Sequence, residues 1–186
     1  MNKVQLQEYL FILNEKLRQR GILGEIALYG GIVMCLALNA RDATHDIDAI
    51  FEPKCDIAVA IKEISKEYNL DDGWLNDGVK GFTSKNNDLI PFQKLSNLNI
   101  YAASPLYMFA MKCLSCRMTN KTEIEDIKFL IKYLNIRSVA RAEEILYSYY
   151  PRNRILPKTF YMLMELLGEW NAVHNKGSNW TYSKKY

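Results

Sequence analysis

The sequence has few of the residues that build zinc centres, and little net charge. It contains two histidines and four cysteines, and its formal charge at pH 7 is +3. Cys113 and Cys116 form a CxxC pair, but no second pair and no suitably spaced histidines complete a zinc site. We therefore expect buried, reduced thiols. The small charge permits a local anion-binding site but does not indicate a general nucleic-acid-binding surface.

Long hydrophobic runs and a leader-like N-terminus are also missing. Residues 26–40 carry no charge, but this run is shorter than the ~20 residues that a membrane span needs, and Gly30 and Gly31 interrupt it. The N-terminal segment is unlike a secretory signal peptide because it carries several charges, at Lys3, Glu8, Glu15 and Lys16. These features predict a soluble, cytoplasmic protein with no membrane partner.

Hydrophobic periodicity in the first half predicts alternating helices and strands. Helices are expected over 4–20, 32–38 and 56–68, and strands over 25–29 and 47–51. This order is typical of an α/β unit. Residues 71–88 are rich in turn formers and predict a loop with a short helix. The segments 89–95 and 98–102 are predicted to pair as strands.

The second half reads as helical. Ser104 is a good N-cap and Pro105 a good first helical residue. The segment TEIE, residues 122–125, predicts a capping box that opens a second helix. Ser138 opens a third, and residues 159–170 predict a fourth. The tail after Asn171 is either disordered or packed as an arm. The sequence thus predicts an α+β protein, with an α/β core over 1–103 and a helical region over 104–186.

Two aspartates stand one residue apart at the second predicted strand. Side chains alternate along a strand, so Asp46 and Asp48 are predicted to point to the same side. Carboxylates about 5–6 Å apart repel by about 3 kcal/mol at an effective dielectric of 20, and a cation between them reverses that sign. Oxygen ligands suit Mg²⁺ or Mn²⁺ rather than zinc. A helix cap or an exposed strand face is the alternative interpretation.

The neighbours of this pair favour a ligand site. Gly30 and Gly31 follow one strand and precede a helix, where they let the backbone approach a ligand. A tight turn that needs positive φ would select the same residues. Arg41 and Thr44 add a positive charge and a hydroxyl just before the aspartates. Lys112 is an isolated charge in an apolar helix, so it either extends to solvent or meets an anion.

These motifs resemble a known active-site signature. A glycine pair, a helix and then RDATHDID resemble the signature of the DNA polymerase beta-like nucleotidyltransferase superfamily. The R-x-x-T-x-D-x-D variant is similar to that of bacterial abortive-infection and MenT-like nucleotidyltransferase toxins, and to related nucleotidyltransferase-like proteins without assigned function. In the second half, SPLYMFAMKCLSCR resembles the family helix with a nucleotide-contacting lysine. TEIEDIKFL resembles a segment with an acidic residue, matched by Asp126 or by the adjacent Glu125.

The resemblance implies a nucleotidyltransferase-like mixed sheet with flanking helices, followed by a helical C-terminal part. It implies metal binding and catalysis for Asp46 and Asp48, a role for Asp126 in positioning or deprotonating the acceptor, and substrate binding for Gly30, Gly31, Arg41, Thr44 and Lys112. The segment WLNDGVKGF is also similar to the unassigned group, and no role follows for Asn76, Asp77 or Lys80.

The expected function is transfer of a nucleoside monophosphate from a nucleoside triphosphate to a hydroxyl on RNA or protein, with Mg²⁺ or Mn²⁺. A tRNA or protein acceptor, a toxin role and a cognate antitoxin follow from the resemblance alone. The alternative is a catalytically weak nucleotide- or metal-binding module of the same fold. Two departures favour it: LSNLNIYAAS lacks the third carboxylate of many members, with Asp88 the nearest acid, and Gly31 stands where many have serine.

Overall fold

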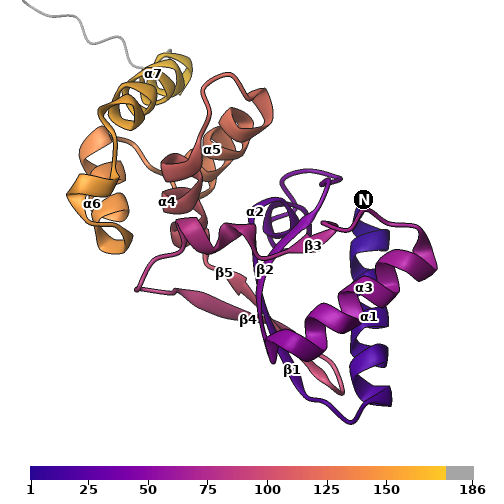
Figure 1. Ribbon diagram of the computed structural model, residues 1–186. Helices are drawn as coiled ribbons and strands as arrows, with labels where there is room; N and C mark the ends of the chain where they lie inside the picture. Colours follow the sequence, from indigo (N-terminus) through magenta and orange to yellow (C-terminus); the bar gives the residue numbers. More distant parts are fainter. Residues whose placement is uncertain (175–186) are drawn as a thin grey trace, which may run out of the picture.

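The computed structural model describes the backbone of residues 1–174 and the side chains of residues 1–168. As the sequence predicts, the fold is α+β, with a five-stranded mixed sheet, flanking helices and a helical C-terminal part (Figure 1). The sheet order is β3-β2-β1-β5-β4, and these strands span Leu75–Asn76, Ile47–Glu52, Gly24–Tyr29, Leu98–Ala103 and Leu89–Lys94.

The pairing of the first two strands corrects the expected α/β unit. β1 pairs antiparallel with β2 and parallel with β5. The link between β1 and β2 contains a single α-helical turn, α2 (Gly30–Ile32), and a π-helical segment, η1 (Val33–Ala37). Eight helical residues rise only ~12 Å, which is less than the ~20 Å length of a six-residue strand. The chain therefore does not return along β1, and the next strand runs antiparallel.

Two long helices lie together beside the sheet. They are α1 (Lys3–Gln19) and α3 (Lys54–Tyr68), which run side by side at one end of Figure 1. Leucines at helical spacing bury one face of α1, namely Leu6, Leu10, Leu13 and Leu17. At its N-terminus the Asn2 side chain accepts a hydrogen bond from the Gln5 N–H, and the Gln5 side chain accepts one from the Asn2 N–H.

The segment before β4 contains a strand that the sequence analysis missed. β3 has only two residues, too few for a recognisable alternation, and it pairs parallel with β2. A short 3-10 helix, η2 (Gly78–Phe82), follows it, as expected for this turn-rich region. β4 and β5 pair antiparallel as predicted, with an irregular register between Pro91 and Gln93.

Up to residue 174, where the described backbone ends, the second half contains four α-helices and a 3-10 turn. The helices are α4 (Pro105–Ser115), α5 (Lys121–Tyr133), α6 (Val139–Tyr149) and α7 (Pro157–His174), and the turn is η3 (Arg152–Arg154). Ser104 and Ser138 cap α4 and α6 as predicted. The expected capping box at Thr122 is wrong, because Asn120 caps α5 by accepting from the backbone N–H groups of Thr122 and Glu123.

The buried apolar side chains form one cluster that continues from the sheet into the helical half. Leu28 of β1 and Ala102 of β5 belong to it, and so do Phe109 of α4 and Ile131 of α5. Within the described residues, no helix has the length and apolar character needed to cross a membrane. The predicted tail after Asn171 lies outside the described residues from position 175 onward.

Candidate functional site

A cleft of about 770 Å³ lies between the sheet end of the first half and the start of the helical half. Its walls come from α2, the loop before β2, η2, α4 and the first turn of α5. All of the residues that the sequence predicts for the site line this cleft: Gly30, Gly31, Arg41, Thr44, Asp46, Asp48, Lys112 and Asp126. The fold thus brings together side chains that are distant in the sequence.

The aspartate pair lies on the sheet side of the cleft. Asp48 is in β2, where it is paired with Tyr29 of β1 and Asn76 of β3, and Asp46 precedes the strand. Burial raises the pKa of the Asp48 carboxyl, and the nearby Asp46 charge raises that pKa further, while Lys112 opposes the shift. The two carboxylates therefore repel each other at the edge of the cleft, as their spacing predicts.

The pair fits a hard cation that is shared with a substrate. Among the described residues, no group of three or more His, Cys, Asp and Glu side chains converges to form a metal cage. Mg²⁺ is commonly held by one or two carboxylates together with substrate phosphates. Asp46 and Asp48 supply this kind of ligand, and the glycine turn gives the Asp48 carboxylate the space that it occupies. The Asn76 amide lies 3.5 Å from Asp46.

Each glycine is required for its own steric reason. Gly30 has φ of +62°, and a Cβ there would lie 2.3 Å from Oδ2 of Asp48. At Gly31 the obstacle is space, because a Cβ would lie 2.0 Å from Oγ1 of Thr44 and 2.3 Å from Nη2 of Arg41. The absence of both side chains lets the segment that carries Arg41, Thr44 and Asp48 press against this turn.

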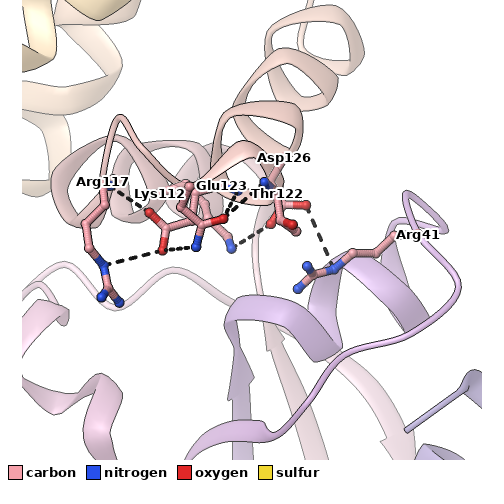
Figure 2. Close-up of polar contacts among 7 residues, drawn as sticks. Arg41, Lys112, Arg117, Thr122, Glu123 and Asp126 are labelled. Carbon is pink, nitrogen blue, oxygen red and sulfur yellow. Dashed lines mark hydrogen bonds and ion pairs between the residues drawn. The ribbon is translucent and has the colours of Figure 1, made fainter.

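A buried ion cluster forms the opposite wall. Lys112 Nζ donates a hydrogen bond to Oδ2 of Asp126 at 2.7 Å, and the two side chains are only 12% and 5% exposed. Arg41 Nε lies 3.9 Å from Oδ1 of Asp126. Figure 2 shows Arg41 approaching Asp126 from the first half of the chain, while Lys112 approaches it from α4. The Lys112 ammonium therefore ends in the cleft, on a carboxylate, and does not extend freely into solvent.

The geometry separates the two acidic candidates on α5. Asp126 is buried in the cleft between two cations. Glu125 is 71% exposed, lies 3.5 Å from Lys128 and is not among the residues that line the cleft. Arg41 also retains an unsatisfied donor: within the described part of the chain, its buried Nε has no hydrogen-bond partner.

The acid nearest to β5 is held away from the cleft. Ser104 Oγ donates a hydrogen bond to Oδ2 of Asp88, and Tyr149 OH donates to the same oxygen at 2.7 Å. Asp88 does not line the cleft. Asp77 also points elsewhere: Lys80 at 2.7 Å and Lys54 at 3.0 Å lower its pKa to about 2.

Several lining residues were not predicted from the sequence. They come from η2, from α4, from the turn between α4 and α5 and from the start of α5, and include Val79, Phe82, Met108, Met111, Arg117, Asn120 and Glu123. In the turn, Glu123 accepts a hydrogen bond from the backbone N–H of Arg117 at 2.7 Å (Figure 2). It accepts another from the Asn120 amide at 3.1 Å. The sequence signal was an Asn-x-x-Glu pattern at 120–123, two residues before the predicted capping box.

No protein-family model, curated protein or solved structure matches this chain. Membership in the nucleotidyltransferase superfamily therefore stays a prediction from the motifs. The candidate site is supported by its own geometry: an aspartate pair, a glycine turn and a buried cation cluster that face one cleft.

Proposed function

We propose that the protein transfers a nucleoside monophosphate from a nucleoside triphosphate to an acceptor hydroxyl. The observation that carries this proposal is the convergence of Asp46, Asp48, the Gly30–Gly31 turn and Lys112 on one cleft. Two clustered carboxylates suit a hard cation, and buried cationic donors suit phosphate oxygens. Both groups lie in one cavity, as binding of a metal-chelated triphosphate requires.

The reaction assigns one task to each wall of the cleft. In the reaction, the acceptor oxygen bonds to the α-phosphorus, the bond to the β-phosphate oxygen breaks, pyrophosphate leaves and the hydroxyl proton is released. Asp46 and Asp48 would hold Mg²⁺ or Mn²⁺, which supplies charge neutralisation and alignment when bound. Lys112 and Arg41 bind phosphate oxygens and stabilise the charge that develops on them. Gly30 and Gly31 let Asp48, Thr44 and Arg41 lie directly against the turn, which keeps these groups together at the cleft.

Asp126 is assigned a positioning role. Its Oδ2 lies 2.7 Å from Lys112 and its Oδ1 lies 3.9 Å from Arg41, so each carboxylate oxygen faces a cation. Asp126 therefore fixes the two cations at the cleft wall before a nucleotide binds. This role differs from the two that the resemblance implies, which are positioning and deprotonating the acceptor.

The identity of the acceptor stays a prediction. RNA, including tRNA, and protein hydroxyls are both expected from the resemblance, as are a toxin role and a cognate antitoxin. The alternative function, a nucleotide- or metal-binding module with little turnover, is favoured by one observation. The nearest candidate for a third acid, Asp88, is bound to Ser104 and Tyr149 outside the cleft.

The decisive experiment offers the protein Mg²⁺ and each α-labelled nucleoside triphosphate, with total RNA and cell protein as acceptors. Label in a macromolecule, lost with Asp48→Asn, supports transfer and identifies the acceptor class. Mg²⁺-dependent nucleotide binding without label transfer supports the binding module. If the wild-type protein neither binds nor transfers any nucleotide, both proposals are wrong.

Parallel metal analysis tests the metal assignment, because zinc that is stoichiometric and survives mild chelation contradicts a hard-cation site.

A further inference from the structure

One side of the cleft is apolar, and the proposed triphosphate chemistry does not use it. η2 packs against α4, and together they contribute Val79, Phe82, Met108 and Met111 to the lining. Val79, Met108 and Met111 are almost fully buried, with 6%, 0% and 4% of their surface exposed. Phe82 is 41% exposed. The two methionines therefore form part of a closed wall, while the phenylalanine ring still presents surface to a ligand.

Phe82 is distinguished from the other described aromatic residues because it lines the cleft. No other Phe, Tyr or Trp among the described residues lines the cleft. It is also the last residue of the WLNDGVKGF segment, for which the motif analysis gave no role. An exposed ring at the edge of a polar cavity costs free energy in water. A planar ligand that stacks on the ring would remove that cost.

The backbone around Phe82 is held from the far side. The Tyr150 hydroxyl, on a side chain that is 1% exposed, donates to the Phe82 carbonyl at 2.5 Å. The Arg154 guanidinium donates to the carbonyls of Gly81 at 2.7 Å and Thr83 at 3.4 Å. Three successive carbonyls are thus fixed by the end of α6 and by η3. Because these bonds fix the backbone, the segment itself loses little further conformational entropy when a ligand stacks on the Phe82 ring.

The spacing along α4 connects this surface to the phosphate side. Met108 lies one helical turn before Lys112, a separation of about 5–6 Å between neighbouring side-chain positions, and Met111 is adjacent to Lys112 in sequence. A ribose joins the base of a nucleotide to its first phosphate across a gap of similar size. The apolar wall beside η2 is thus within reach of the base of a nucleotide whose triphosphate lies at Lys112 and the aspartates.

We propose that Phe82 is the nucleobase platform of the cleft: the base of the donor nucleoside triphosphate stacks on its ring, against a wall that includes Met108 and Met111. This inference rests on the proposed function and adds the base subsite to it. Every base has a π-face, so stacking gives affinity for nucleotides as a class without selecting one base. Stacking of a base on an aromatic ring contributes enough that truncation of the ring lowers affinity by about tenfold to a hundredfold.

The test compares a ligand that has a base with one that has none. Binding of α,β-methylene analogues of ATP, GTP, CTP and UTP, which cannot transfer their nucleotide, is measured by calorimetry in Mg²⁺ without any acceptor. Inorganic tripolyphosphate is the ligand without a base. For Phe82→Ala we expect about a tenfold or greater loss of affinity for all analogues that bind the wild type, and unchanged affinity for tripolyphosphate. Phe82→Trp should retain nucleotide affinity because it keeps an aromatic face.

Two further variants guard against effects on folding. Phe82→Leu keeps apolar bulk but removes the π-face, and it should lose nucleotide affinity as Phe82→Ala does. Phe11→Ala removes a ring that is 55% exposed on α1 and should change neither affinity. Normal nucleotide binding by Phe82→Leu, or equal losses of nucleotide and tripolyphosphate affinity, overturns the base platform alone. A wild-type protein that binds neither class of ligand overturns the proposed function and the platform together.

Discussion

At the residue scale, Asp48 is the side chain whose ionisation the cleft opposes most directly. Burial and the Asp46 charge raise the pKa of its carboxyl above the ordinary value of 3.8. The folded protein therefore holds the Asp48 proton more tightly than the unfolded chain does. At neutral pH the ionised group destabilises the fold, and this cost disappears as pH falls through the raised pKa toward 3.8.

Asp48→Asn should therefore leave the metal-free protein as stable as the wild type at pH 7, or more stable by about 0–2 kcal/mol. The advantage should vanish below the ordinary aspartate pKa, where both forms are neutral. Urea unfolding over this pH range measures it. Stabilisation by Mg²⁺ with nucleotide should shrink in the variant, because a ligand stabilises in proportion to its affinity for the folded state. A strongly destabilised variant with an intact Mg²⁺ response would make the pair structural.

The Lys112–Asp126 pair has the opposite character, because removing one partner leaves a buried charge. The two side chains are 12% and 5% exposed and 2.7 Å apart. Lys112→Met should destabilise the protein by about 3–5 kcal/mol, because it leaves the Asp126 charge buried without its partner. The loss is smaller to the extent that Arg41 balances the Asp126 charge. Adding Asp126→Leu should recover most of this loss. Urea unfolding of the two single variants and the double variant measures the coupling between the residues.

Lys128→Met is the matched control, since its ion pair with Glu125 is exposed and should contribute within about 0.5 kcal/mol. Should Lys112→Met be as neutral as this control, the Lys112 charge is solvated in solution and the cation cluster is not preformed. Loss of triphosphate affinity is then to be measured with the Lys112→Met/Asp126→Leu variant, whose folding the unfolding curves report independently.

At the scale of elements, the start of α5 builds one wall of the cleft, and its cap decides where that wall begins. Asn120 accepts hydrogen bonds from the N–H groups of Thr122 at 3.1 Å and Glu123 at 3.4 Å, and its amide donates to the Glu123 carboxylate. Glu123 in turn holds the backbone of Arg117. The cap therefore orders the whole turn between α4 and α5, which the cleft uses as its rim.

Asn120→Ala should cost about 1 kcal/mol of stability, whereas Thr122→Ala should stay within about 0.5 kcal/mol because Thr122 is exposed inside the first helical turn. Thermal unfolding of the two variants measures the difference. Asn120→Asp keeps a capping oxygen and serves as the control for the loss of the amide. The reverse order, with Thr122→Ala the costlier change, would restore the capping box that the sequence suggested.

At the scale of the whole molecule, the sheet and the C-terminal helices pack into one hydrophobic core. The Tyr29 and Tyr107 rings meet edge to face at 6.1 Å, and Tyr107 stacks on Tyr149 at 4.9 Å. The Tyr107 hydroxyl accepts from the backbone N–H of Ser84 at 2.7 Å, and the Asn86 amide donates to the Ser148 carbonyl. These contacts join the segment before β4 to α4 and α6.

The protein should consequently unfold as one cooperative unit. Native-state hydrogen exchange should give the same opening free energy for protected amides in β1 and β5 as for those in α4 and α5. The physical reason is that the two halves share one apolar core. If one half unfolds, the apolar surface of the other half that packed against it becomes exposed to water. Helical amides that open at a free energy lower by more than about 2 kcal/mol would instead indicate two independent domains divided near residue 103.

The sequence by itself determined the features that follow from local backbone geometry. The leucines of α1, the Ser104 cap and the paired aspartates could be predicted, because helical and strand spacing fixes which neighbours share a face. Eight residues that line the cleft could also be named in advance, from the unusual glycine, carboxylate and lysine positions and from the motif resemblance.

Only the tertiary structure decided which of these groups meet and what they do to one another. Local patterns left Asp126 and Glu125 equivalent, and packing buried one while exposing the other. Local patterns also allowed Asp88 to be the third acid of the site. In the structure it accepts a hydrogen bond from Tyr149, which lies in a helix far along the chain. Phe82 gained its place because residues from α6 and η3 hold its backbone. Such contacts depend on how elements pack over long sequence separations, which short-range periodicity does not encode.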